Sequence, residues 1–446
     1  MLSRIELRNC SFSGPLPNSM TNLTQLRYLD LSSNGFEGSI PSFNRSRNLT
    51  HIDLSRNDLR EPIPSSFVEG LLNLVYVDLR FNSLNGTIPS SLFNLPSLQK
   101  LQLSNNHFDG QLTDFLTASQ LDTVDLSSNN LNGPIPLSLF DLKRLNILSL
   151  SSNNFTGIVL LEMIQRLSNL TKLDLSYNSL SINASGSNSN FFPNLTTLNL
   201  ASCNLQGFPN LKNQSRLFHL DLSNNQIGGE IPNWIWEVGN GSLVYLNLSR
   251  NLLVGLQEPF VIPSLSVLDL HSNNLGGKIP IPQASVYVDY SSNDFNSSIP
   301  ADIGNNLTWA YFFSVSNNNI TGNQFSTFEN TSFKGNMGLC GFPLTSDVED
   351  NHSYPETEIN PNWRADESNR HSDTKTQING NLIAVECGFI TGLGIVVGPL
   401  LFCKRWREWY YKYVDRIVFK ILHRQEQGRK NRGRRPRRNP IRRHKG

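Results

Sequence analysis

The sequence predicts an α/β-type solenoid with a parallel concave β-sheet, followed by one transmembrane helix. Two observations lead to this prediction: the pattern LxxLxLxxN recurs through residues 1–322, and one long apolar run lies near the C-terminus. The Asn of the pattern returns every 20 to 26 residues, which is the period of leucine-rich repeats. The chain therefore has about 14 repeats, with these residues at the Asn position: Cys10, Asn34, Asn57, Asn82, Asn106, Asn129, Asn153, Asn178, Cys203, Asn225, Asn251, Asn273, Asn293 and Asn318.

Each repeat is expected to form one coil that contains a short strand. In the second repeat, Leu26, Leu29 and Leu31 are spaced as in a strand with one buried face. Asn34 then turns the chain, and its amide can bond backbone groups of neighbouring coils. Because one coil cannot bury its own apolar face, stability has to come from stacked neighbours. Cys10 and Cys203 stand at the Asn position, so we interpret them as structural.

The second half of many repeats reads LxGxIP, as in residues 84–89, 131–136 and 275–280, with Phe in place of Leu in 36–41. Glycine permits unusual backbone angles, and proline suits an extended segment outside the main sheet. The signature is similar to that of the plant-specific leucine-rich-repeat class, in which it forms a second strand on the convex side. We therefore expect a plant-specific leucine-rich-repeat arc.

Cysteine usage and motifs argue against metal sites and catalysis. The five cysteines are few for a secreted chain, and none belongs to a CxxC pair. No His/Cys cluster has the spacing of metal ligands, so packing must hold the fold together. The sequence has no nucleophile elbow, metal motif or phosphate loop, and its many Ser, Asp and His residues belong to the repeat consensus or stand alone. We predict that the protein is not an enzyme and uses no metal or cofactor.

The apolar run of residues 382–403 is long enough to cross a bilayer as a helix. Lys404, Arg405 and Arg407 follow directly, and the positive-inside rule then places the repeats outside the cell. We predict a single-pass type I protein of the plasma membrane. Two small-xxx-small pairs within the run predict a face for helix association, formed by Gly388, Gly392, Gly394 and Gly398.

The net charge of +2 hides an asymmetry between the two sides of this run. Residues 404–446 hold 17 Lys and Arg against three acids, whereas the preceding 403 residues hold 21 against 33. Residues 345–381 are polar and acidic, which predicts a juxtamembrane stalk. Residues 404–446 are expected to form a short basic cytoplasmic tail that is attracted to anionic lipid. A nuclear signal or nucleic-acid arm uses the same residue types, but next to a membrane helix we favour lipid and expect no nucleic-acid partner.

Two C-terminal segments resemble one family. Residues 324–333, 335–336 and 338–341, within a segment at 323–344, resemble the sequence that closes the repeat array in plant receptor-like proteins. Residues 388–389, 392–402, 404–407 and 409–410 resemble their membrane helix and its flank. Within that family the chain is most similar to the Verticillium-wilt-resistance group. The resemblance implies a kinase-less cell-surface receptor that binds an extracellular peptide, protein or glycan from a pathogen or from the plant. It also implies signalling in plant defence through a leucine-rich-repeat receptor kinase, contacted through the ectodomain and the transmembrane helix.

The chain also departs from the family pattern. Met1 opens inside a repeat, without a signal peptide or a paired-cysteine cap, and the last repeat runs from Gly322 straight into the closing segment. The 43 residues after Cys403 contain no kinase motif. We expect a truncated or internally deleted receptor-like protein. The alternatives are a leucine-rich-repeat binding or inhibitor protein and a non-functional truncated receptor.

The outward side chains of the strands predict a ligand surface on the concave sheet. The position six residues before each Asn is rich in aromatic and cationic groups, the types that anchor interfaces. The next outward column is mostly Asp, which belongs to a repeated LDLS and is interpreted as scaffold. The predicted ligand-binding residues of the first column are Tyr28, His51, Tyr76, Lys100, Lys172, His219, Tyr245 and Tyr287.

The chain contains 17 Asn-x-Ser/Thr sequons, and many fall where a repeat turns toward the convex side, which suits glycosylation in a secreted solenoid. Asn247 falls on a concave strand and is less suited to modification. The predicted glycosylation sites are Asn22, Asn48, Asn85, Asn169, Asn194, Asn213 and Asn306.

Overall fold

The computed structural model describes residues 2–116, 120–183, 193–300, 303–323, 336 and 338–340. The chain divides into two compact units, Met1–Asp350 and Asn351–Gly446, and all described residues belong to the first. The predicted stalk, the membrane segment with its four glycines and the basic tail lie outside the described residues, as does most of the closing segment. Within the described part of the chain, no helix is both long and apolar enough to cross a membrane.

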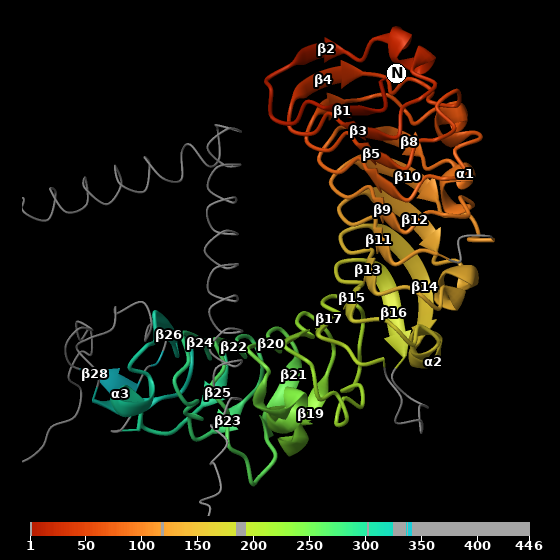
Figure 1. The fold of residues 1–446 in the computed structure, drawn as a ribbon. Helices are drawn as coiled ribbons and strands as arrows, with labels where there is room; N and C mark the ends of the chain where they lie inside the picture. The colour runs from red at the N-terminus through yellow and green to blue at the C-terminus, as the bar shows by residue number, and fades with distance from the viewer. Residues whose placement is uncertain are drawn as a thin grey trace, which may run out of the picture. The chain divides into compact units, whose positions relative to one another are not determined.

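Fourteen parallel strands follow one another in chain order and form the main sheet, which lines the inner side of the repeat array (Figure 1). Neighbouring strands pair at the same repeat position, as Tyr28 with His51 and His51 with Tyr76. This arrangement confirms the predicted parallel-strand solenoid. The strands are β1 (Arg4–Glu6), β3 (Tyr28–Asp30), β5 (His51–Asp53), β7 (Tyr76–Asp78), β9 (Lys100–Gln102), β11 (Thr123–Asp125), β13 (Ile147–Ser149), β15 (Lys172–Asp174), β17 (Thr197–Asn199), β18 (His219–Asp221), β20 (Tyr245–Asn247), β22 (Val267–Asp269), β24 (Tyr287–Asp289) and β26 (Phe312–Ser314).

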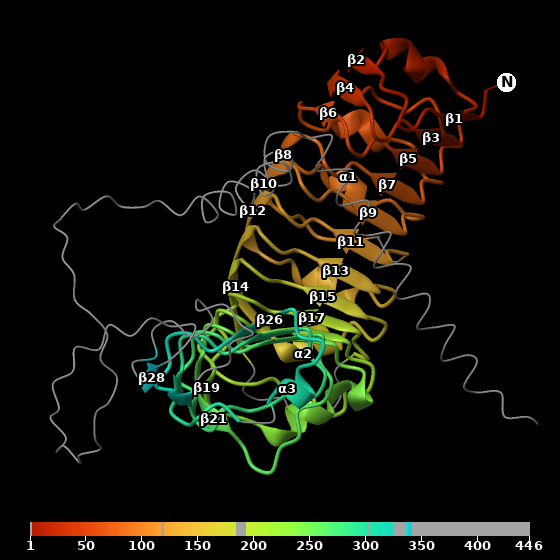
Figure 2. The same ribbon diagram turned by 90° about the vertical axis from the view of Figure 1, so that its left-hand side faces the viewer.

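The LxGxIP half of the repeats forms a second set of parallel strands along the opposite edge of the coils (Figure 2). This set is divided into five short sheets. The first four sheets are β2 (Ser13–Pro15), β4 (Gly35–Gly38) and β6 (Asp58–Leu59); β8 (Asn85–Thr87), β10 (His107–Gln111), β12 (Asn130–Pro134), β14 (Asn154–Leu160) and β16 (Ser179–Asn183); β19 (Gly228–Ile231) and β21 (Leu252–Leu256); β23 (Gly276–Gly277) and β25 (Asp294–Phe295). The fifth pairs β27 (Thr321–Asn323) with β28 (Gly338–Cys340).

The second set is interrupted at the ninth repeat. The sequence there, Leu205 to Pro209, is one residue shorter than LxGxIP, and the segment forms no strand between β16 and β19. A missing residue shifts every later side chain to the other face of an extended segment, so the ladder cannot continue in register. As a result, β16 is the last strand of its five-stranded sheet.

Short helical turns cover the outer side of the coils. Five of them begin directly after a proline of the repeat, as η1 does after Pro17 and α1 after Pro89. The carbonyl oxygen of this proline accepts the first hydrogen bond of the turn, from Met20 in η1 and from Leu92 in α1, each at 3.0 Å. The turns are η1 (Asn18–Asn22), η2 (Ser65–Val68), α1 (Ser90–Phe93), η3 (Leu137–Asp141), α2 (Leu161–Gln165), η4 (Asn233–Gly241) and α3 (Ile303–Asn306).

From the second repeat onward, the consensus leucines of the described coils pack into one continuous core between the two sets of strands. In the first repeat, Leu2 and Leu7 are 54% and 37% exposed. The Asn of each repeat sits at the edge of this core and ties neighbouring coils together, as predicted. In the third repeat, the Nδ2 of Asn57 donates to the carbonyl oxygens of Leu54 at 3.0 Å and of Leu31, in the preceding coil, at 3.1 Å. Its Oδ1 accepts a hydrogen bond from the backbone N–H of Phe36 at 3.1 Å.

Asn336 continues this ladder beyond the fourteen predicted positions. It is buried, its Oδ1 accepts from the N–H of Ile320 at 3.0 Å, and its Nδ2 donates to the carbonyl of Val315 at 2.8 Å. The sequence pattern missed this residue because no LxxLxL run precedes it.

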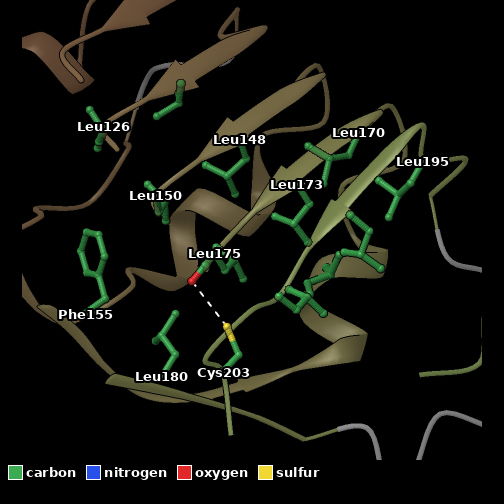
Figure 3. Close-up of a cluster of buried hydrophobic side chains, with 14 of the residues drawn as sticks. Leu126, Leu148, Leu150, Phe155, Leu170, Leu173, Leu175, Leu180, Leu195 and Cys203 are labelled. Carbon is green, nitrogen blue, oxygen red and sulfur yellow. Dashed lines mark hydrogen bonds between the residues drawn. The ribbon is translucent and has the colours of Figure 1, made fainter. Parts of the chain in front are cut away.

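Cys203 occupies the Asn position of the ninth repeat and lies among the core leucines (Figure 3). Its thiol donates to the carbonyl oxygen of Leu175 at 3.5 Å. The thiol thus makes one of the hydrogen bonds that the side-chain amide of Asn makes in other repeats. Burial, with a smaller effect of Asp174 and Asp221, raises the pKa of the Cys203 thiol to about 12, so the thiol stays protonated. Cys203 and the exposed Cys10 are both free thiols.

Candidate ligand-binding face

The column of side chains predicted to contact a ligand lies on the main sheet, where each member is the first residue of its strand. The strands pair in register, so residues of neighbouring repeats stand directly beside one another. Parallel strands are about 4.8 Å apart, which is close to the stacking distance of flat rings. Aromatic residues at this position in consecutive repeats can therefore stack on one another along the array.

Three aromatic side chains in consecutive repeats form a stack. The ring of His51 lies 4.2 Å from that of Tyr28 and 4.1 Å from that of Tyr76, and both pairs are within 9° of parallel. The guanidinium of Arg4 covers the outer face of Tyr28, with its Cζ 3.7 Å from the ring centroid. Each ring is partly exposed. The stack presents ring edges and polar tips to the concave side, and Lys100 stands exposed in the next repeat.

Two further stacked pairs lie toward the other end of the sheet. His219 and Tyr245 are 4.0 Å apart, and Tyr287 and Phe312 are 4.6 Å apart, with nearly parallel rings in both pairs. Val267 separates the two pairs. Lys172 is partly exposed in the eighth repeat, without a ring beside it. The eight predicted ligand residues are thus divided between the stack of repeats 2 to 4, the pair at repeats 10 and 11, Tyr287 in the pair at repeats 13 and 14, and the single side chains Lys100 and Lys172.

Burial favours the neutral form of the two histidines of the column. Burial lowers the pKa of His51 and of His219 below the usual value for histidine, although neighbouring aspartates act in the opposite direction. A neutral imidazole has one donor and one acceptor nitrogen. Both rings can therefore offer either type of hydrogen bond at the concave surface.

The aspartates of the second column accept hydrogen bonds from nearby backbone N–H groups. The Oδ1 of Asp30 accepts hydrogen bonds from the backbone N–H of Ser32 at 2.9 Å and from its hydroxyl at 2.6 Å. Asp53 and Ser55 repeat the arrangement. A carboxylate that accepts bonds from the residue two positions later closes a local turn, which supports the scaffold interpretation of this column.

The comparisons with known proteins agree with this architecture. A family model described as leucine rich repeat matches residues 47–108, and another with the same description matches 25–45, 120–142, 169–193, 216–238 and 264–282. Receptor like protein 24 of Arabidopsis thaliana is 36% identical over 339 residues, which is 68% of this chain and 39% of that protein. The chain belongs to the plant leucine-rich-repeat receptor-like proteins. It spans less than half the length of this relative.

Solved ectodomains share the fold of this receptor-like protein. The plant peptide hormone receptor RGFR1 in complex with RGF2 is 27% identical, with a TM-score of 0.65 over 76% of this chain and 56% of that one. The Arabidopsis receptor kinase HAESA, in complex with the peptide hormone IDA and the co-receptor SERK1, is 29% identical, with a TM-score of 0.52 over 74% of this chain and 56% of that one.

Four repeats carry a bulky residue directly before the ladder Asn, and this feature was not predicted from the sequence. The residue before the ladder Asn has a positive φ in all fourteen repeats, and it is Ser or Asn in ten of them. The other four residues at this left-handed position, Arg56, Phe81, Tyr177 and Arg250, are large. Phe81 and Tyr177 are 42% and 55% exposed, and the Cζ of Arg56 lies 4.5 Å from the ring centroid of Phe81. These four residues could have been found in the sequence, because they replace the usual Ser or Asn at this position.

Repeat 4 of this receptor-like protein also replaces the usual Ser by Arg80. Its guanidinium pairs with the buried carboxylate of Asp78, with Nη2 2.7 Å from Oδ2. The hydroxyl of Tyr76 donates to the same carboxylate at 3.2 Å. This network connects the aromatic stack to the second column and fixes the position of the Tyr76 ring.

Among the described residues, Asp269, His271 and Asp289 bring three potential metal ligands within 4.8 Å of one another. The Nδ1 of His271 lies 2.7 Å from Asp269 Oδ1, and its Nε2 accepts a bond from the Nε of Arg250 at 3.4 Å. Since the guanidinium brings a positive charge to this group, we interpret it as a hydrogen-bonded network and infer no metal site.

The predicted glycosylation sites lie away from the main sheet. Asn22, Asn48, Asn85, Asn169, Asn194 and Asn213 are exposed, and Asn306 is partly exposed at the end of α3. Asn247 lies on β20, where its Oδ1 accepts from the N–H of Ser249 at 3.0 Å. Modification of these residues stays a prediction.

Proposed function

We propose that this chain is a cell-surface receptor-like protein that binds an extracellular peptide on its main sheet and signals in plant defence through a partner receptor kinase. The observation that supports ligand binding most directly is the stack of Tyr28, His51 and Tyr76. Aromatic and cationic side chains are enriched at the energetic centres of protein interfaces. Here they are prearranged, so a ligand loses little entropy in ordering them.

An extended peptide suits the geometry better than a compact ligand. The stack and the two further pairs lie along the direction in which the strands follow one another, from repeat 2 to repeat 14. A peptide that crosses the strands would pack its side chains against the exposed ring edges and bond its backbone to His51 and His219. The solved relatives with this fold hold the peptides RGF2 and IDA, which supports a peptide as the ligand class for this chain.

The partner and the membrane anchor belong to the same proposal. A kinase-less receptor needs a kinase in another chain, and one structural relative is solved together with the co-receptor SERK1. Residues 382–403 would anchor the chain with its repeats outside the cell, and the glycines of that run would contact the partner helix. The pathogen or plant origin of the peptide would decide which defence response follows.

Capture of extracellular peptides tests the binding step. The full chain would be expressed in leaf cells behind a secretory signal, immobilised, and incubated with peptides extracted from leaf extracellular fluid with and without pathogen challenge. Captured peptides would be quantified by mass spectrometry. We expect specific peptides on the wild-type chain and loss of these peptides on the Tyr76→Ala/Tyr245→Ala double variant.

Tyr311→Ala is a matched control, because Tyr311 is a 91% exposed tyrosine outside the column. If both variants capture the same peptides as the wild type, the main sheet is not the binding face. In parallel, kinases that co-purify with the chain from membranes would be identified. A chain found only in the soluble fraction, with no associated kinase, would contradict the receptor assignment.

A further inference from the structure

A cleft outside the main sheet lies where the second set of strands is interrupted. Its volume is about 550 Å³. The ninth repeat forms no strand beside β16, although the N–H of Ile182 still donates to the carbonyl oxygen of Cys203 at 2.9 Å. Beyond this bond, the ninth repeat and β16 border the cleft. The cleft is lined by Ile158 of β14, by Ser181 and Asn183 of β16, and by Asn204, Gln206 and Phe208 of the ninth repeat.

The cleft combines amides with apolar surface. Asn204 and Gln206 are exposed, and the Nδ2 of Asn204 donates to the hydroxyl of Ser181 at 3.1 Å. Ile158 is 67% exposed, although it lies on a regular strand. Phe208 is fixed by packing against the core and by an edge contact with Trp234, with ring centroids 6.4 Å apart. Amide groups can both donate to and accept from hydroxyl groups, while the apolar side chains suit the C–H faces of a sugar ring.

One lining residue begins an N-glycosylation sequon. Asn183 is exposed and begins the sequon Asn-Ala-Ser at residues 183–185. We propose that Asn183 carries an N-linked glycan whose first sugar rests in this cleft, against Ile158, Gln206 and Phe208. The attachment forms a bond from Asn183 Nδ2 to C1 of the sugar, breaks the bond from C1 to its lipid-linked diphosphate carrier, and releases one amide proton. The proposal rests on the extracellular placement of the repeats proposed above.

The position gives this glycan a structural role. No strand pairs with the outer edge of β16, which keeps only the bond from the N–H of Ile182 to the carbonyl oxygen of Cys203 in the ninth repeat. A strand edge without a partner strand is a template for pairing with another chain. A bulky, hydrated group at the end of β16 would block such pairing. Asn154 is a natural comparison, because it is an exposed sequon at the start of the neighbouring strand β14 and does not line the cleft.

The test is the rate at which a peptide-N-glycosidase releases each glycan from the native chain. The full chain would be produced in leaf cells behind a secretory signal, with its glycans kept in the oligomannose form. Release in water labelled with heavy oxygen marks each freed site for mass spectrometry. We expect Asn183 to be occupied and released roughly tenfold more slowly than Asn154, a factor that corresponds to about 1.4 kcal/mol of docking free energy.

After denaturation the two release rates should become equal. The Ile158→Ser/Gln206→Ala double variant should lose the protection, and both residues are exposed, so the fold does not depend on them. An unoccupied Asn183, or equal rates at Asn183 and Asn154 in the native chain, would overturn the proposal while leaving the receptor function intact. If no sequon is occupied, Asn22 and Asn48 included, the extracellular placement fails as well.

Discussion

The imidazole of His51 lies flat on the ring of Tyr76, with centroids 4.1 Å apart and planes 4° from parallel. Tyr28 covers the other face of the same imidazole at 4.2 Å. One histidine therefore connects three repeats of the main sheet on its solvent side, in addition to the backbone ladder beneath. This contact contributes to stability as well as to the proposed ligand face, and the two contributions can be separated by mutation.

Replacing His51 by Ala removes both stacking contacts. Each aromatic pair contributes about 0.5–1.5 kcal/mol beyond its buried area, so we expect the unfolding free energy to fall by roughly 1–3 kcal/mol. His51→Phe keeps two ring contacts but removes the polar nitrogens. It should retain most of the stability while losing peptide capture. Thermal unfolding of the full chain in detergent measures the first effect, and a His51→Ala variant as stable as the wild type would show that the stack adds nothing.

Acidification should destabilise the chain through the same histidine and through His219. Burial lowers the pKa of both below that of the unfolded chain, so the unfolded state takes up more protons below about pH 6.5. The contribution of these two histidines to the unfolding free energy is therefore fully present above that pH, and it is lost as the pH falls through their folded-state pKa. The raised pKa of Asp53 and of Asp269, also caused by burial, acts in the opposite direction at lower pH.

The check is the slope of unfolding temperature against pH between about 7 and 5.5, a window around the usual pKa of histidine. A His51→Phe/His219→Phe double variant should have a shallower slope than the wild type, because it lacks the two imidazoles that take up protons on unfolding. Parallel curves for the two proteins would mean that the histidines titrate alike in the folded and unfolded states.

The sequence predicted the main sheet residue by residue, because each strand repeats one pattern and the register follows from it. All fourteen members of the ligand column lie where the spacing placed them. The stacking was not predicted, since pattern spacing gives the neighbours of a side chain but not the orientation of its ring. The interruption at the ninth repeat was also missed, although Leu205 to Pro209 is one residue short of the consensus.

Asn336 shows another limit of pattern reading. A ladder asparagine is recognised by the leucines before it, and Asn336 follows a segment without them. Its hydrogen bonds to Ile320 and Val315 are nevertheless those of a repeat asparagine. The unsatisfied backbone groups of the last coil require a partner, and in the folded chain the closing segment supplies one without repeating the consensus.

The asparagine ladder itself predicts a large effect from a single substitution. Asn57→Ala leaves the carbonyl oxygens of Leu31 and Leu54 without this donor and the N–H of Phe36 without its acceptor. A buried polar group that loses its partner costs about 1–3 kcal/mol, so we expect a loss of at least about 2 kcal/mol in unfolding free energy.

Cys203→Ala is the matched comparison for Asn57→Ala. At the equivalent position it removes only weak bonds from sulfur to the carbonyl oxygens of Leu175 and Ala201, each 3.5 Å long, and the destabilisation should be smaller. Denaturant unfolding of the two variants under the same conditions gives the comparison. Equal losses would mean that filling the space, rather than bonding the backbone, is what the ladder position requires.

Tyr177 should show a conflict between stability and binding. It holds a left-handed backbone conformation, with φ at 55°, and its side chain is 55% exposed. A bulky L-residue in this conformation costs about 1–2 kcal/mol, whereas Asn adopts it readily. Tyr177→Asn installs a residue that other repeats carry at this position, and it should raise the unfolding free energy by about 1 kcal/mol. Ser179→Ala is introduced into both this variant and its reference protein, because the new Asn would otherwise begin a sequon with Asn178 and Ser179. Tyr177→Val, which is β-branched, should lower it.

If Tyr177 is a ligand contact, the stabilised Tyr177→Asn variant should capture less peptide than the wild type in the assay described above. Ser128→Asn, at the same position two repeats earlier, exchanges one small residue suited to the conformation for another and should change neither property. A gain in stability with unchanged peptide capture would show that Tyr177 does not contact the ligand. A loss of stability would mean that the ring makes contacts in the folded chain that outweigh the backbone strain.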